Sequence, residues 1–228
     1  MAKKRGTKRK RQGYGNYKMK KYKKGQISKL WNAVNNNTKS TELKRSLFFL
    51  DNVQYLRIGT FVDLIRLPLN SEVLNGRLGR DVYVKSIFLN IQANMAGAVD
   101  TYKLWFALVR VNDNTFMTDL TTTQLNDLKK EIWRYKEGET DFFWNWLKPR
   151  NFDYLDKYNI VWTYMLNFSD NLRTRFVKKK FNINKRVRFT NLDTDGKFAT
   201  GKYWLFIQSD SDTPGGTYMQ WNVRYKDG

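Results

Sequence analysis

The chain has 228 residues, with 42 Lys and Arg against 21 Asp and Glu, and therefore a formal net charge of +21 at pH 7. It contains no Cys, which excludes disulfides and Cys-based zinc sites, and no His, which excludes the Ser-His-Asp triad and the commonest metal ligand. The sequence contains no run of about 18 apolar residues, so no transmembrane helix is expected. This composition favours a protein that binds a polyanion over an enzyme, and we expect no catalytic residues, no metal and no other cofactor.

The basic residues concentrate at the N-terminus. Residues 1–41 hold 14 Lys or Arg and no acidic residue, because Glu42 is the first acid in the chain. Residues 42–228 hold the remaining 28 basic and all 21 acidic residues. Like charges at this density repel one another and little apolar surface is available to compensate. We therefore divide the chain into a basic arm, 1–41, that is expected to be disordered when free, and a folded body, 42–228.

The arm has the composition of a nucleic-acid-binding segment. Tyr14, Tyr17 and Tyr22 lie among the lysines, and aromatic rings between cations suit single strands, whose bases stack while their phosphates are neutralised. A solubilising or nuclear-targeting tail is the alternative interpretation, because 3–5 and 8–11 resemble nuclear localisation signals. The residues of the arm predicted to bind nucleic acid are Lys3, Lys4, Arg5, Lys8, Arg9, Lys10, Arg11, Lys18, Lys20, Lys21, Lys23 and Lys24.

The end of the arm changes pattern. Ile27, Leu30, Trp31 and Val34 recur at helical spacing and predict a short amphipathic helix over 28–35. We expect this helix to pack as an anchor between the arm and the body, with partner binding as the alternative.

From residue 42 onward the apolar residues alternate with a period of two, which predicts strands. Over 175–190 the odd positions are mostly apolar and the even ones polar or basic, and 217–226 repeats this pattern. The even positions place four more candidate nucleic-acid-binding residues on one strand face: Lys178, Lys180, Arg186 and Arg188. This face continues the phosphate track of the arm, is an ordinary solvated strand face, or meets acidic residues of a partner at an interface.

Two other strand predictions concern faces. We expect Tyr83 to share a face with Ile87 in a strand over 82–93, and the even positions of 154–168 to form one aromatic face. Segments 101–111 and 203–207 are apolar on both faces. A second sheet can cover one of those faces, so a loop, the arm or another subunit must cover the other.

Further strands are expected over 44–50, 53–67 and 131–136, and a helix over 120–130 with Asp119 or Thr121 as its N-cap. Asp195-Gly196 predicts a hairpin turn, and Pro214-Gly215-Gly216 predicts the link to the last strand.

Catalytic and metal-binding patterns are weak. Glu137, Glu139 and Asp141 could belong to a metal-dependent nuclease, but they lack a spacing specific to one. Asp210 and Asp212 could bind calcium between subunits, although acidic turn residues explain them better. The aromatic cluster around Trp133, Phe142, Phe143, Trp144 and Trp146 is interpreted as core or subunit-interface packing rather than a sugar platform.

Eight or nine strands with little helix predict an all-β fold, a single eight-stranded jelly-roll sandwich. Three stretches strengthen this prediction. They are the arm Met1-Ala-Lys-Lys-Arg-Gly-Thr-Lys-Arg-Lys-Arg, the strand that begins Arg80-Asp-Val-Tyr-Val-Lys-Ser-Ile, and the ending from Lys202-Tyr-Trp-Leu-Phe-Ile to Tyr218-Met-Gln-Trp-Asn-Val-Arg-Tyr. In these stretches the chain resembles the capsid proteins of circovirus-like viruses, which have circular single-stranded DNA genomes and encode a Rep protein. It departs from them in having a Lys-rich rather than an Arg-rich arm.

The resemblance implies a structural protein that self-assembles into a closed T=1 icosahedral shell in the virion. Its arms would package the single-stranded DNA genome and would bind host nuclear import receptors on the way to the nucleus. Satellite plant virus capsids that package RNA share the same plan. A non-capsid nucleic-acid-binding protein, of a ribosomal or nuclear-shuttle type, is the other alternative.

Overall fold

The computed structural model describes residues 43–69, 76–95, 101–115, 117–133, 151–190, 194–211 and 215–227. The basic arm, the helix predicted over 28–35, and the acidic cluster at 137–141 lie outside the described residues.

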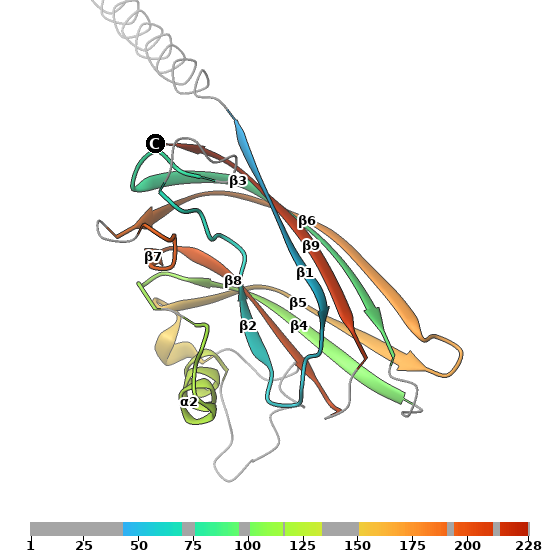
Figure 1. The fold of residues 1–228 in the computed structure, drawn as a ribbon. Coiled ribbons are helices and arrows are strands. Elements are labelled where there is room, and N and C mark those ends of the chain that lie inside the picture. The colour runs from blue at the N-terminus through green and yellow to red at the C-terminus, as the bar shows by residue number, and fades with distance from the viewer. Residues whose placement is uncertain are drawn as a thin grey trace, which may run out of the picture. The chain divides into compact units, whose positions relative to one another are not determined.

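Two antiparallel sheets form the body (Figure 1). One has the strand order β1-β9-β3-β6-β7 and the other the order β2-β8-β4-β5. The strands are β1 (Lys44–Val53), β2 (Thr60–Asp63), β3 (Asp81–Asn94), β4 (Thr101–Val111), β5 (Tyr158–Ser169), β6 (Thr174–Phe189), β7 (Ala199–Thr200), β8 (Lys202–Ser209) and β9 (Thr217–Asp227). Apart from the two-residue β7, the chain crosses between two four-stranded sheets in jelly-roll order, which confirms the predicted fold class.

The main core lies between the two sheets, because alternate residues of the facing strands point inward. In β9, for example, Met219, Trp221, Val223 and Tyr225 are buried, as their alternation predicted. They pack in one cluster with apolar residues of β3, β4, β6 and β8. The same alternation leaves the even positions of β6 on the opposite, solvent-facing side of its sheet.

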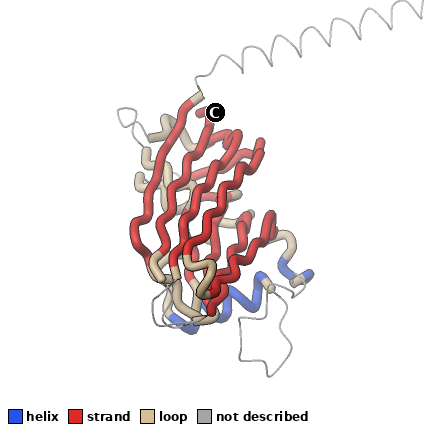
Figure 2. The backbone as a smooth tube through the Cα atoms, turned by 90° about the vertical axis from the view of Figure 1, so that its right-hand side faces the viewer, coloured by secondary structure: helices blue, strands red, loops and turns tan. Residues whose placement is uncertain are grey.

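A second apolar cluster covers the other face of β4 and β8. It contains Trp105 of β4, Trp204 of β8, and Leu125 and Leu128 of helix α2 (Thr122–Ile132). Figure 1 shows α2 outside the four-stranded sheet, and Figure 2 shows the helical segments below the strands. Within the described residues, the cover predicted for the doubly apolar strands is supplied by helix α2 together with loop residues such as Met117. A loop was among the expected covers, whereas the helix was not.

Helix α2 begins where the sequence indicates. Thr121 accepts a hydrogen bond from the Gln124 backbone, and the Gln124 side chain accepts one from the Thr121 backbone at 2.9 Å, which completes a capping box. Among the described residues, no helix is long and apolar enough to cross a membrane.

The faces predicted for the strands over 82–93 and 154–168 are partly wrong, because each pairing contains a β-bulge. The register of β3 shifts between Val84 and Ser86 against both neighbouring strands, so Val82 and Val84 point inward and Tyr83 is exposed, not on the Ile87 face. In β5, Leu108 pairs with Trp162 but Val109 pairs with Ile160, so the strand carries one extra residue.

The β5 bulge divides the predicted aromatic face. Leu166 and Phe168 join the core between the sheets, whereas Tyr158 and Ile160 join the cluster under α2. Tyr154 does not belong to the strand at all, since it lies exposed in the 3-10 helix η2 (Phe152–Tyr154).

Two further segments differ from their prediction. The strand expected over 53–67 is only β2, because the chain turns at Gly59, where φ is +78°, and the Asp63 carboxylate accepts a hydrogen bond from Ile65 N at 2.9 Å. The strand expected over 131–136 is wrong for Glu131 and Ile132, which complete α2; residues 134–136 lie outside the described part.

The turn at Asp195-Gly196 lies on the path from β6 to the short β7, with Gly196 at φ +71°, as the hairpin signal indicated. A buried lysine holds this turn to the body. Lys202 Nζ lies 2.5 Å from Asp63 Oδ2 and donates to the Gly196 carbonyl at 2.7 Å. The ion pair therefore joins β2, β8 and the turn in a place where an unpaired charge would be costly.

Candidate nucleic-acid interface

The candidate interface is the face of the five-stranded sheet that points away from the core, called here the outer face. It is formed by the solvent-facing side chains of β1, β9, β3 and β6. The cross-strand register defines which residues share it, because directly opposed residues point to the same side. Lys178, for instance, opposes Asn90, and Asn90 opposes Gln220.

The four basic residues predicted on β6 all lie on the outer face. Lys178, Lys180, Arg186 and Arg188 are exposed and alternate with the buried positions of the strand. Neither Lys178 nor Lys180 makes an ion pair within the part of the chain that the structure describes. Both side chains lie on an exposed face, where phosphates can reach them.

The two arginines have a different environment. Both contact the carboxylate of Asp81, at the start of β3, and the Arg188 Nε to Asp81 Oδ1 distance is 3.1 Å. The hydrogen bond from Arg186 is the main reason that the pKa of Asp81 lies below its usual value. One carboxylate thus neutralises only part of two guanidinium charges, and the pair keeps a net positive charge.

A second pair of cations was missed by the sequence analysis. Arg45 of β1 and Arg224 of β9 are directly opposed in the sheet, and both are exposed. Like charges in opposed positions destabilise a sheet, and an anion between them would relieve the repulsion. The alternation of β9 does put Arg224 on the polar side, but only the folded sheet brings β1 next to it.

Aromatic and amide side chains lie among these cations. Phe49 of β1 and Phe176 of β6 are each 63% exposed, and Tyr218 of β9 is 38% exposed. Asn90 and Gln220 stand between them on β3 and β9. The outer face therefore combines cations, exposed rings and hydrogen-bonding amides, the set of groups that binds single-stranded nucleic acid without catalysis.

Acidic side chains do not gather on the described part of the outer face. Within the described residues there is no group of three or more Asp or Glu side chains that could hold an ion. Asp210, one of the two acids considered for calcium, instead accepts a hydrogen bond from Lys103 N at 2.7 Å. Its predicted partner Asp212 and the acids Glu137, Glu139 and Asp141 lie outside the described residues, as do the predicted binding residues of the arm.

No family model and no curated protein matches the chain. Among solved structures, Desmodium yellow mottle tymovirus matches with a TM-score of 0.36 and 11% identity over 82% of this chain and 88% of that one. Tomato aspermy virus matches with a TM-score of 0.33 and 12% identity, over 90% and 95% of the two chains. The 60-mer BFDV capsid protein matches with a TM-score of 0.28 and 14% identity, over 81% and 90%. At these values we draw no functional conclusion from the likeness.

Proposed function

We propose that this protein is a viral capsid protein of the circovirus-like type and not an enzyme. Copies of the jelly-roll body would form a small closed T=1 shell, and the basic arm would package single-stranded DNA. The observation that carries the proposal is the division of charge, with 14 basic residues and no acid in residues 1–41 ahead of a two-sheet body. A segment of this charge binds phosphates through counterion release, without sequence preference.

The body supports self-assembly through its apolar surface. Val161 and Tyr164 of the edge strand β5 are 44% and 43% exposed. Exposed apolar side chains on an unpaired sheet edge are characteristic of surfaces that meet another protein. Contacts between copies along β5 would bury them, with the virion as the final location of the protein.

The basic clusters at 3–5 and 8–11 support a second role for the arm. They have the composition of nuclear localisation signals, so host import receptors would bind them before the genome does. Assembly in the host nucleus follows from this order of events. The same lysines and arginines would then pass from the receptor to the phosphates of the genome.

Deletion of residues 1–26 tests the role of the arm. With roughly 8–10 phosphate contacts, the intact chain should bind a single-stranded oligonucleotide with a slope of log K against log salt of about −6 to −7. The truncated chain should lose most of that slope and keep the circular dichroism of its sheets. Equal affinity and slope for the truncated and intact chains would show that the arm does not bind the genome. Parallel titrations with DNA and RNA strands decide which polymer is preferred.

A further inference from the structure

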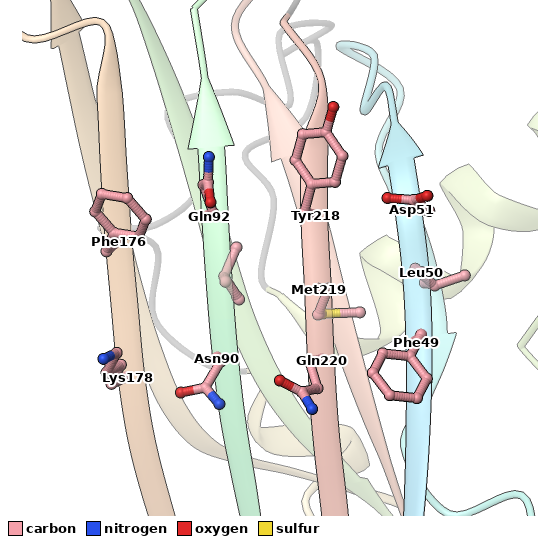
Figure 3. A pocket seen from close by; sticks show the side chains of 11 residues that line it. Phe49, Leu50, Asp51, Asn90, Gln92, Phe176, Lys178, Tyr218, Met219 and Gln220 are labelled. Atoms are coloured by element: carbon pink, nitrogen blue, oxygen red, sulfur yellow. The ribbon is translucent and has the colours of Figure 1, made fainter.

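A groove crosses the outer face near one end of the sheet, over β6, β3, β9 and β1 (Figure 3). Its volume is about 600 Å³, within the range of sites that hold small ligands. Phe176, Gln92 and Tyr218 form one cross-strand row on the outer face, and Lys178, Asn90, Gln220 and Phe49 form the next row (Figure 3). Met219 and Leu50, which also line the groove, point toward the core. The groove is therefore built by side chains from four strands of a rigid sheet.

The exposed rings of the groove suit planar ligands. Phe49 and Phe176 each keep 63% of their surface exposed, and Tyr218 lies between them in the sheet. A nucleobase stacks on such a ring whatever its sequence, because every base has a π-face. The bases of a duplex are already stacked and paired, so only unpaired bases can use these rings.

The polar groups of the groove complement the edge of a base and its phosphate. The Oδ1 atom of Asn90 is buried and has no hydrogen-bond partner within the described part of the chain. A buried acceptor of this kind needs a donor, and each base carries an N–H donor on its pairing edge. Lys178 is the cross-strand partner of Asn90, which places a cation beside the same position for the phosphate.

The charge around the groove favours one kind of ligand. The groove is lined by one cation, Lys178, and one acid, Asp51, and the outer face around it adds the cations Lys180, Arg45 and Arg224. The chain's own arm carries 14 positive charges and no acid, and a second copy of the chain carries the same excess of positive over negative residues. Either of these occupants would meet charges of its own sign, whereas a nucleic acid strand supplies both anions and rings.

We propose that this groove binds unpaired nucleobases of single-stranded nucleic acid, with bases stacked on Phe176, Tyr218 and Phe49 and a base N–H donating to Asn90 Oδ1. The inference rests on the proposed packaging function and adds to it a site on the folded body that recognises the base itself. It makes the body, as well as the arm, responsible for preferring single strands over duplexes.

The test uses the full-length chain and two fluorescent oligonucleotides of equal length, oligo(dT) and an abasic strand with the same phosphates. Wild type should bind oligo(dT) more tightly than the abasic strand, and Phe176→Leu should reduce that excess about ten-fold. Tyr218→Leu should act in the same direction. Phe152→Leu is the matched control, because Phe152 is 65% exposed but lies on η2, and it should leave the excess unchanged.

Three results overturn the groove assignment: equal binding of both strands by wild type, an unchanged excess in Phe176→Leu, or an equal loss in Phe152→Leu. Loss of self-association in Phe176→Leu with an unchanged excess would instead assign the groove to a second copy. Binding of the abasic strand and its salt dependence report on the phosphate contacts of the arm and of the outer-face cations, and not on the stacking of bases in the groove. If the proposed packaging function is wrong, binding of the abasic strand will be weak. If only the groove assignment is wrong, binding of the abasic strand will be strong and the excess for oligo(dT) will not depend on Phe176.

Discussion

Lys129 places an amine against aromatic rings beneath the four-stranded sheet. The residue is 1% exposed, and its Nζ donates to the Ile58 carbonyl and lies 5.7 Å from the centroid of the Phe206 ring. Burial disfavours the charged form and lowers the pKa of Lys129 from 10.5 to about 8. The folded chain therefore releases this proton at a lower pH than the unfolded chain does.

This difference predicts a pH dependence of stability. Between about pH 8 and 10.5 the unfolded chain holds one proton more at this residue, so its contribution to stability rises with pH across that window. Lys129→Met removes the contribution. The free energy of unfolding of Lys129→Met minus that of wild type should fall by about 2 to 3 kcal/mol between pH 7 and pH 10 in urea titrations.

The adjacent residue supplies the control. The side chain of Lys130 is 61% exposed, so the corresponding difference for Lys130→Met should hardly vary over the same pH range. A flat difference for Lys129→Met would mean that its ammonium group is solvated in the folded chain.

At the scale of the element, α2 depends on its N-terminal capping box. The Thr121 hydroxyl satisfies a backbone N–H that no residue of the helix can pair. Thr121→Ala should therefore lower the free energy of unfolding by about 1 kcal/mol, measured by urea denaturation. Thr123→Ala changes the same side chain at an exposed position inside the helix and should cause no loss. Equal effects of the two substitutions would exclude a capping role.

The strands show what periodicity can and cannot predict. Alternation identified β6 and β9 and the cationic positions of β6, because burial on one face imposes a period of two. It failed at Tyr83, since a bulge inverts the faces without changing the local composition. A sequence signal for a strand does not say where an extra residue is accommodated.

The groove could not be predicted from the sequence, for a related reason. Phe49, Tyr218 and Phe176 belong to β1, β9 and β6, which the jelly-roll strand order brings into one sheet, with β3 between β9 and β6. Each of these residues alone looks like an exposed aromatic residue of a strand. Only the register reveals that they surround the buried acceptor of Asn90.

At the scale of the whole molecule, the cationic surfaces and the apolar sheet edge belong to different parts of the chain. The arm carries cations without acids, and the body carries a sheet face with cations and an edge strand with exposed apolar residues. In the proposed capsid the first two would meet the genome and the third would meet other copies of the chain. Arm charge would also offset the repulsion between packed phosphates, so packaging and assembly would be coupled.

Negative-stain microscopy of the purified full-length protein, mixed with single-stranded DNA at low salt, tests this account most directly. The capsid proposal predicts closed particles of uniform diameter, and sedimentation should show protein and DNA together in one fast species. Monomers or dimers that bind DNA without forming closed particles, at every protein concentration and salt tried, would contradict the capsid assignment and would identify a non-capsid nucleic-acid-binding protein instead.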